Sequence, residues 1–427
     1  MIDYVAAIEM AKRKSKTGRR AWLFMSLAGN LGLLFAFKYL NFTTGALTQA
    51  FQLVNMNLSF PYLRVLLPVG ISFYTFQTLS YTLDVYRGTR EPERHLGIFA
   101  LYVSFFPQLV AGPIERSTFL LPQLHKHYQF DYDRVVGGLQ LMLWGFFKKL
   151  VIADRLAVYV DQVYNNPGNY QGIPVILASY FFAFQIYCDF SGYSDIAIGS
   201  AQIMGIQLTK NFDRPYFSKS LAEFWQRWHI TLSSWFKNYV YFSLGGNRCS
   251  KAKWLRNIIV VFFLSGLWHG ANWTFLAWGL LHGIYLIMGI YLRPLRNGLV
   301  HLTKLNRFPK LLKIAQVTIT FHLVVFAWVL FRSKSLQDVI VHIRSACDLR
   351  GSSLAAVAAP VSKLYLIIAL SGIVFMEVVH LLERKRPMPC LVGEQPLIIR
   401  WAVYNMLFFG ILFFGVFGKQ EFIYFQF

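Results

Sequence analysis

The stretch FFLSGLWHGANWTFLAWGLLHG, residues 262–283, is largely apolar, yet it contains two histidines, His269 and His282, each followed by glycine. An apolar run of this length is typical of a membrane-spanning helix, which needs about 20 such residues. A histidine in hydrocarbon costs free energy unless it meets a partner or a watered cavity, so it marks a candidate functional site. The stretch therefore predicts a membrane protein with chemistry inside the membrane.

The whole chain has the composition of an integral membrane protein. Of its 427 residues, 56% are hydrophobic and only 15% are charged. With further apolar runs such as 21–40 and 405–418, we expect about ten spans or partial spans. Lipid leaves the backbone satisfied only in helices and closed barrels, and the short alternating strands of a barrel are missing from the pattern. We therefore predict an all-α polytopic membrane protein, with residues 1–427 forming one domain.

The basic residues occur in short runs between the apolar segments. The formal net charge is +22, and KRKSKTGRR (residues 12–20) and RGTREPER (residues 87–94) are two such runs. The positive-inside rule places them in the cytoplasm, where they attract anionic lipid headgroups. Recognition of a phosphorylated substrate is the alternative that we keep open. Because the charges do not gather on one soluble face, we expect no nucleic-acid partner.

The four cysteines predict neither a disulfide framework nor a metal site, because Cys188, Cys249, Cys347 and Cys390 are far apart and form no CxxC pair. Residues 1–20 lack the order of a signal peptide, since the basic run follows the short apolar stretch instead of preceding it. We therefore expect no cleaved leader.

Residues 206–253 are rich in tryptophan and too polar to span, so we expect an interfacial or re-entrant segment. Ser220 and Glu223 fit a capping box that starts a helix at about residue 221. Apolar residues then recur at three- and four-residue spacing, which predicts one amphipathic helix that also carries His229. The apolar stripe comprises Phe224, Trp225, Trp228, Leu232, Trp235 and Phe236. Such a helix is often only a membrane anchor, but we expect this one to lie in the centre of the fold.

The two His-Gly pairs cannot serve one site if they share one straight helix. His269 and His282 are 13 residues apart, so their side chains would point roughly 140° away from each other. Gly266 and Gly270 flank His269 at the spacing that lets a neighbouring backbone approach closely. We therefore expect His269 at a crowded helix junction. A histidine that only hydrogen-bonds a neighbouring helix is the alternative.

Three carboxylates also lie in apolar surroundings, where each is expensive if it faces lipid. Glu115 lies in AGPIERS, whose glycine and proline favour a turn or re-entrant segment that is buried or lines a cavity. Asp189 and Asp195 lie in YCDFSGYSDIAIG. We interpret this pair mainly as hydrogen-bonding groups that hold helices together, with a proton relay or substrate contact as the alternative.

A histidine in a low-dielectric channel suits general-base catalysis, because it can take a proton from a hydroxyl and return it. Transfer of an acyl group from a thioester to an alcohol needs such a base and donors for the oxyanion. No GxSxG elbow accompanies the histidines, so direct transfer to the acceptor fits better than a covalent serine mechanism.

Five separated segments, in this order, resemble the membrane-bound O-acyltransferase family, and in particular its bacterial branch that acetylates alginate. The resemblance extends from about residue 60 to the end of the chain. The five segments are FFPQLVAGPIERSTFLLPQL (105–124), YCDFSGYSDIAIG (187–199), EFWQRWHITLSSWFKNYVYFSLGGNR (223–248), FLSGLWHGANWTFLAWGLLHG (263–283) and FIYFQF (422–427).

The resemblance implies a ring of spans around a thin centre, with one funnel for the acyl donor from the cytoplasm and another that opens outward for the acceptor. It assigns catalysis to His269, in LWHG, and to His229, in RWHITLS, and so selects His269 over His282. Seven further residues are candidates for lining the channel or binding substrate: Asp189, Asp195, Glu115, Trp225, Trp228, Asn272 and Trp273. The family's chains carry more hydrophobic helices ahead of the basic run, so we expect a chain that is shortened or starts late, with its core intact.

The function that the resemblance implies is O-acetylation of an exported polysaccharide such as alginate, from the bacterial inner membrane. Acetyl-CoA would be the donor substrate, with no tightly bound cofactor and with extracytoplasmic acetyltransferases as partners. D-alanyl transfer to teichoic acid and peptidoglycan O-acetylation are the alternatives within enzymes. Outside enzymes, a proton-coupled transporter would show inverted repeats, which we do not find, and a structural scaffold would leave both histidines unexplained.

Overall fold

The computed structural model describes residues 1–58, 60, 62, 68, 70–351, 353–383, 388–418 and 422–423. The last four residues of the terminal motif, 424–427, and the side chain of Cys390 lie outside this part. Within it the chain is helical without any β-strand, which confirms the all-α prediction. Seven helical stretches are long and apolar enough to cross a membrane, so the chain is multi-pass. A ring of ten is not confirmed.

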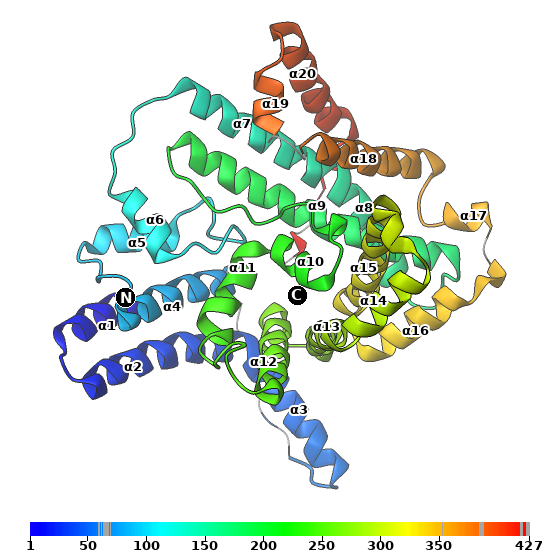
Figure 1. Cartoon of the computed structure of the whole chain (residues 1–427). Helices are drawn as coiled ribbons and strands as arrows, with labels where there is room; N and C mark the ends of the chain where they lie inside the picture. Colours follow the sequence, from blue (N-terminus) through cyan, green and yellow to red (C-terminus); the bar gives the residue numbers. More distant parts are fainter. Residues whose placement is uncertain are drawn as a thin grey trace.

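The helical elements follow one another closely along the chain (Figure 1). Those of the first half are α1 (Ile2–Lys12), α2 (Lys16–Leu34), η1 (Phe35–Tyr39), α3 (Leu40–Leu53), α4 (Ile71–Arg87), α5 (Leu96–Ser104), α6 (Ser117–Leu124), α7 (Tyr132–Phe146), η2 (Phe147–Ala153), α8 (Asp154–Tyr164) and α9 (Ile173–Ile203). Those of the second half are η3 (Pro215–Phe217), α10 (Leu221–Arg227), α11 (Ile230–Trp235), η4 (Phe236–Tyr241), α12 (Lys251–His269), α13 (Trp273–Tyr291), α14 (Arg293–Leu302), η5 (Leu305–Arg307), α15 (Pro309–Arg332), α16 (Leu336–Cys347), η6 (Leu349–Gly351), α17 (Leu354–Val357), α18 (Lys363–Leu382), α19 (Met388–Gly393) and α20 (Leu397–Phe414).

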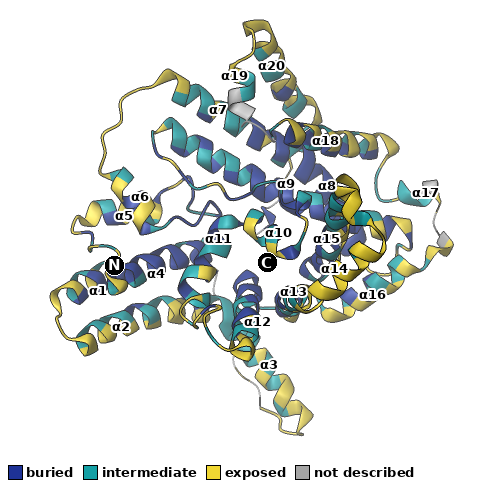
Figure 2. Ribbon diagram, in the orientation of Figure 1, coloured by how far each residue is buried: buried dark blue, intermediate teal, exposed yellow. Residues whose placement is uncertain are grey.

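The candidate spans include two long composite helices, α2–η1–α3 and α7–η2–α8, each continued through a π-helical turn. The other five are α9, α13, α15, α18 and α20. Among the seven candidate spans α9 is the most buried, and Figure 2 shows α3 and α14 as largely exposed. Apolar side chains that are exposed on a span are the ones that a bilayer would cover.

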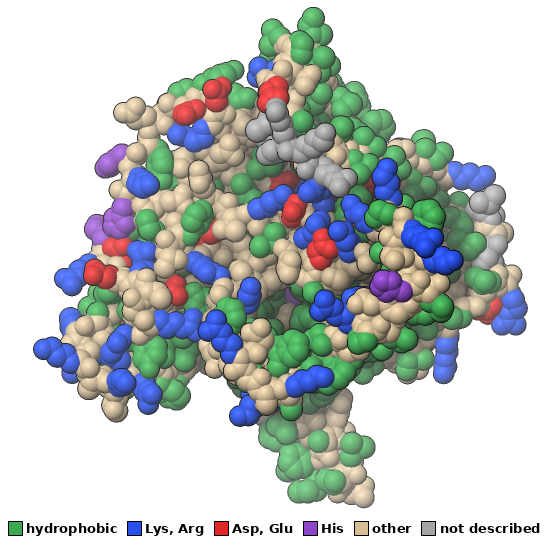
Figure 3. Space-filling model, in the orientation of Figure 1, with side chains coloured by type: hydrophobic (Ala, Val, Ile, Leu, Met, Phe, Trp, Pro, Cys, Tyr) green, Lys and Arg blue, Asp and Glu red, His purple; other side chains and the backbone are tan. Residues whose placement is uncertain are grey.

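Helices α2 and α4 run antiparallel and bring the two basic runs to one end of the molecule. Near the start of α2, Arg19 donates to the carbonyl of Tyr86 at the end of α4, over 2.5 Å. At the other end, Lys38 of η1 donates to the hydroxyl of Ser72, over 3.3 Å. Lys and Arg side chains are spread over the face drawn in Figure 3. The ends that carry residues 12–20 and 87–94 therefore lie on one side of any membrane that these helices cross.

Glycines let the central helices approach backbone to backbone. A Cβ on Gly145 of α7 would lie 2.6 Å from the carbonyl oxygen of Gly192 in α9, and a Cβ on Gly279 of α13 would lie 2.3 Å from that of Phe262 in α12. Gly266 of α12 faces Gly279, since a Cβ there would lie 3.3 Å from the Gly279 Cα. The small-residue spacing around His269 thus marks a close helix contact, as the sequence predicted.

The polar segment 206–253 supplies the middle of the fold. Figure 1 shows α10 and α11 among α4, α9, α12 and α15. The predicted start is confirmed, because the hydroxyl of Ser220 accepts a hydrogen bond from the Glu223 N–H and α10 begins at Leu221. The single continuous amphipathic helix is wrong, since the chain leaves the helix at Trp228 and His229 before α11 begins. Phe224, Trp228 and Leu232 are nevertheless buried, in agreement with a central position.

Candidate active site

His269 is the last residue of α12. The next residue, Gly270, is extended, with φ −172° and ψ 156°, so the helix stops there. The imidazole is 5% exposed and lies among the rings of Trp268, Trp278 and Phe331, at centroid distances of 4.9, 4.9 and 5.1 Å. His269 therefore sits at a helix junction in an aromatic environment, where low polarity strengthens any electrostatic interaction with a bound molecule.

His229 lies at the junction between α10 and α11, in a left-handed conformation with φ 42° and ψ 56°. Its ring is fully buried and meets Phe190 edge to face at 4.7 Å. Burial lowers the pKa of His229 to about 3, so the ring is neutral near pH 7.

One ring nitrogen of His229 is held by Asn211, and the other is left as a base. Nδ1 lies 3.1 Å from the side-chain oxygen of Asn211, and Thr231 donates to that same oxygen from its hydroxyl, over 2.9 Å, and from its N–H, over 3.3 Å. Because this oxygen is the acceptor, Nδ1 carries the proton. Nε2 then has a lone pair, and among the described residues it has no hydrogen-bond partner.

Asn211 also explains why the helix breaks at His229. Its backbone carbonyl accepts the N–H of Ile230 over 2.9 Å, which takes this donor out of the helical pattern. The contact spans 19 positions of sequence, so helical spacing alone does not predict it. Asn211 was not among the residues that we selected from the sequence.

Trp268 brings the two histidines into one site. Its ring lies 4.9 Å from His269 and 5.9 Å from His229, and Phe73 contacts both Trp268, at 5.3 Å, and His229, at 6.4 Å. Two histidines that are 40 positions apart in the chain therefore share one aromatic wall. Neither Trp268 nor Phe73 was among the residues that we selected from the sequence.

His282 is not remote, as one straight helix would require. The break after His269 lets α13 fold back along α12, so His282 and His269 lie against the same ring, Trp278, at 5.0 and 4.9 Å. His282 is fully buried and its Nδ1 accepts a hydrogen bond from Trp225 Nε1 over 3.3 Å. His282 thus belongs to the same aromatic cluster, but the lone pair of its Nδ1 already accepts the hydrogen bond from Trp225.

Some of the other predicted site residues belong to the aromatic wall, and others join helices or turns to one another. The first group is Trp225 and Trp228. Trp225 contacts His282, and Trp228 is 1% exposed between Phe212 and Trp328, at 5.1 and 4.9 Å. Both tryptophans therefore build the wall behind the histidines.

Each of the three predicted carboxylates forms ion pairs or hydrogen bonds with other residues of the chain. Asp189 pairs with Lys149 at 2.7 Å and accepts the N–H of Ile423 over 2.8 Å, and Asp195 pairs with Lys148 at 2.7 Å. These contacts join α9 to η2 and to the end of the chain, which agrees with the helix-holding interpretation.

Glu115 accepts hydrogen bonds from both the N–H and the hydroxyl of Thr209. It is 1% exposed in the turn before α6, and burial raises its pKa to about 7. The predicted buried turn is confirmed, and the carboxyl group ties it to the start of the central segment.

Asn272 lies beyond the histidine, in the turn that joins α12 and α13, and Trp273 is the first residue of α13. Asn272 caps α13 through the N–H of Thr274, at 3.0 Å, and donates to the carbonyl of Lys334 over 2.8 Å. Trp273 is 52% exposed and contacts Phe42 at 5.2 Å.

A recess of about 460 Å³ opens on this turn, next in the chain to His269. It contains a salt bridge of 2.6 Å between Arg332 and Asp161. Its lining is Asp161, Asn165, Gly270, Ala271, Asn272, Phe275, Arg332, Ser333 and Lys334. Of the predicted residues, Asn272 lines this recess.

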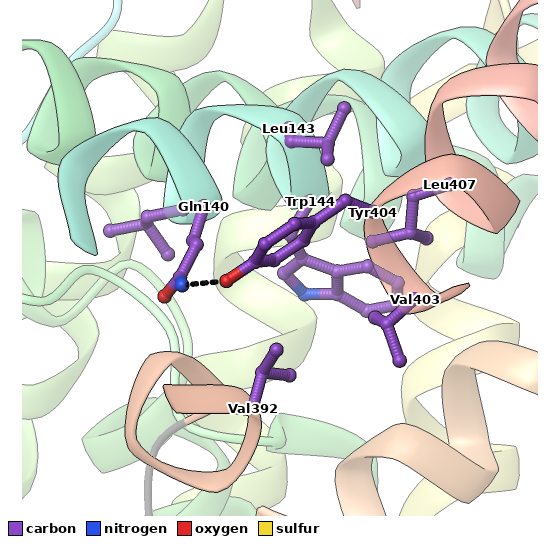
Figure 4. A pocket seen from close by; sticks show the side chains of 8 residues that line it. Gln140, Leu143, Trp144, Val392, Val403, Tyr404 and Leu407 are labelled. Carbon is purple, nitrogen blue, oxygen red and sulfur yellow. Dashed lines mark hydrogen bonds between the residues drawn. The ribbon is translucent and has the colours of Figure 1, made fainter. Parts of the chain in front are cut away.

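A second hollow lies away from the histidines, between α7 and the C-terminal helices. Figure 4 shows Gln140, Trp144 and Tyr404 around it, with Gln140 donating to the hydroxyl of Tyr404. Its volume of about 10 Å³ admits at most one water molecule. It is too small for a substrate site.

Comparison with known proteins gives a family match that includes both histidine segments. The model of the membrane-bound O-acyltransferase family, MBOAT, matches residues 95–331. The probable alginate O-acetylase of Pseudomonas aeruginosa is 41% identical over 318 residues, which cover 74% of this chain and 58% of that protein. The chain thus spans less than two thirds of the length of this relative.

Two other kinds of relative also match. The peptidoglycan O-acetyltransferase of Helicobacter pylori is 36% identical over 384 residues, 83% of this chain and 70% of that protein. The teichoic acid D-alanyltransferase of Bacillus subtilis is 29% identical over 278 residues, 62% of this chain and 69% of that protein.

Proposed function

The chain belongs to the membrane-bound O-acyltransferase family, and we propose that it uses cytoplasmic acetyl-CoA to O-acetylate an exported polysaccharide such as alginate. The observation that carries this proposal is the pair His229 and His269, which come from separate segments and meet at Trp268. A buried histidine in an apolar centre suits general-base catalysis, in which it takes the proton of a hydroxyl that attacks a thioester.

The proposed reaction is a direct transfer. The acceptor hydroxyl attacks the thioester carbonyl while His269 takes its proton, so that an O–C bond forms. The tetrahedral intermediate then collapses, the C–S bond breaks, and the CoA thiolate recovers a proton from the His269 imidazolium. His229, with Nδ1 fixed by Asn211, accepts a hydrogen bond at Nε2 and orients the acceptor.

The arrangement of charge supports entry of the acyl donor from the cytoplasmic side of a bacterial inner membrane. Residues 12–20 and 87–94 lie at one end of the fold, and α12 runs from Lys251 to His269. Its 19 residues place the histidine roughly 27 Å from the start of the helix. Basic side chains near the entrance for acetyl-CoA would attract its phosphates and so raise its local concentration. Extracytoplasmic acetyltransferases would receive the group on the other side.

Peptidoglycan is the second acceptor that we keep. The relative from Helicobacter pylori covers larger shares of both chains than the alginate O-acetylase does, 83% and 70% against 74% and 58%. The chemistry of acetyl transfer would be the same, and only the acceptor differs. D-alanyl transfer has the weaker support, at 29% identity.

The test supplies labelled acetyl-CoA to purified protein in lipid nanodiscs and offers alginate-type glycan or peptidoglycan as the acceptor. We expect His269→Ala and His269→Gln to lower turnover by roughly 10²–10⁴-fold, the contribution of a general base. The matched control is His342→Ala, because His342 is also buried but is hydrogen-bonded to Ser179, over 3.1 Å, and stacked on Tyr164.

Near-parental turnover by well-folded His269→Ala protein would refute the mechanism. Label on peptidoglycan alone would select the second acceptor, and transfer of D-alanine instead of acetyl would select the third reaction. Proton-coupled uptake without any labelled product would favour a transporter.

A further inference from the structure

The end of α12 is held by two side chains from η1, the π-helical turn of the first candidate span. The ammonium of Lys38 donates to the carbonyls of Trp268, over 2.7 Å, and of His269, over 3.2 Å. The hydroxyl of Tyr39 donates to the carbonyl of Leu267 over 2.9 Å. These are the last three carbonyls of the helix, which an α-helix leaves without partners of its own. Residues 38 and 39 therefore cap the helix that carries His269.

The bonds of Lys38 go to neutral oxygens. Besides the two carbonyls, the ammonium donates to the hydroxyl of Ser72, over 3.3 Å, and it lies 6.0 Å from the centre of the Trp268 ring. A cation at a helix C-terminus complements the negative end of the helix dipole. A lysine within an apolar span is expensive and is a functional candidate by default.

The π-helical turn fits such a role. Single π-turns within longer α-helices are found frequently at functional sites. Here Phe35–Tyr39 is the π-helical part of the span Lys16–Leu53. It presents two consecutive side chains, of Lys38 and Tyr39, to one helix end that is 228 to 231 positions away in sequence.

We propose that Lys38 is a positioning residue for acyl transfer, which fixes the last turn of α12 and thereby the direction of the His269 imidazole. Tyr39 supports it at the preceding carbonyl. This inference rests on the proposed function, because it assigns His269 the proton transfer. Lys38 does not touch the reacting atoms on this account, and it acts through the backbone of Trp268 and His269.

The activity test compares Lys38→Met, Lys38→Arg and Tyr39→Phe in the nanodisc assay. Lys38→Met keeps the length of the side chain but loses the charge and all donors. Because a misplacement of about 1 Å can cost 10²-fold in rate, we expect kcat to fall by about 10²-fold while KM for acetyl-CoA stays near the parental value. Lys38→Arg should recover most of kcat, since it keeps a cation and donors at the carbonyls. Tyr39→Phe should give a smaller fall in the same direction.

The matched control is Lys363→Met. Lys363 is an exposed lysine at the first position of α18, so its loss should leave kcat unchanged. Parental kcat in folded Lys38→Met protein would overturn the inference, and so would Lys38→Arg protein that is as slow as Lys38→Met.

A readout without substrate separates this inference from the proposed function. Loss of the cap should let the end of α12 fray, so amide hydrogen exchange in residues 264–271 should rise in Lys38→Met and stay parental in Lys38→Arg and Lys363→Met. If the parental protein transfers no acetyl group, the proposed function fails, whereas the exchange result still tests the cap. Unchanged hydrogen exchange in Lys38→Met would overturn the inference that Lys38 caps α12.

Discussion

The left-handed backbone at His229 predicts that glycine is more stabilising there than alanine. His229 has φ 42° and ψ 56°, a region that side chains with a Cβ adopt at a cost. His229→Gly and His229→Ala both lose the imidazole, its hydrogen bond to Asn211 and its contact with Phe190. The difference between the two variants therefore isolates the backbone.

Two opposing terms decide the size of this difference. A residue with a Cβ pays roughly 1–2 kcal/mol in the left-handed region, and glycine avoids this cost. Glycine in turn loses more conformational freedom on folding, by roughly 0.5–1 kcal/mol relative to alanine. We therefore expect His229→Gly to be more stable than His229→Ala by about 1 kcal/mol, although neither variant should transfer acetyl groups at the parental rate.

The assay is unfolding of the purified protein in detergent, followed by tryptophan fluorescence. The matched control is a second pair, Ser233→Gly and Ser233→Ala, because Ser233 lies within α11, where glycine should be the less stable by about 1 kcal/mol. The sign should thus reverse between two positions that are four residues apart. If alanine is the more stable at both positions, residue 229 is helical and the account of the break is refuted.

Two further predictions concern buried charge. Burial raises the pKa of Glu115 from 4.5 to about 7; its contribution to stability is therefore complete below about pH 4.5 and is lost as the pH rises through 7, by about 3 kcal/mol. The melting temperature of the parent should fall between about pH 5 and about pH 8 by more than that of Glu115→Gln, and parallel pH curves would contradict this. Lys149 pairs with Asp154 at 2.8 Å and with Asp189 at 2.7 Å. Lys149→Met should cost roughly 3–5 kcal/mol of unfolding free energy by stranding two carboxylates, against less than about 1 kcal/mol for Lys210→Met at an exposed pair; equal losses would refute the difference.

The properties that the sequence predicts well are those set by neighbours along the chain. Apolar length gave a multi-pass helical protein, and the spacing from Ser220 to Glu223 gave the start of α10. Each depends on contacts within a few positions, which residue patterns encode directly.

The breaks beside the histidines depend on more distant contacts, and there the pattern was misleading. Apolar spacing continues through His229, but a backbone carbonyl from Asn211 captures the N–H that would have continued the helix. At the other break a local signal existed. Gly270 is a residue that commonly ends a helix, and Asn272 is one that commonly begins the next, as it does here by capping α13. The apolar length of residues 262–283 outweighed it, and His282 was therefore placed away from a cluster to which it belongs. The cap by Lys38 joins segments about 230 positions apart, so no local pattern indicates it.

Both histidines of the candidate site lie at helix ends, and the membrane gives a physical reason why this fixes them. A helix end leaves backbone groups without partners, and in an apolar environment each needs a polar side chain nearby. The side-chain oxygen of Asn211 meets this need at the start of α11 by accepting the N–H of Thr231, and the ammonium of Lys38 meets it at the end of α12. Each cap also contacts a catalytic candidate, the imidazole of His229 in one case and the carbonyl of His269 in the other. In the middle of a helix, the direction of a side chain would instead follow the rotation of the whole element, which apolar packing sets only loosely. The groups that satisfy the backbone at these two helix ends are therefore the same groups that fix the directions of the two imidazoles.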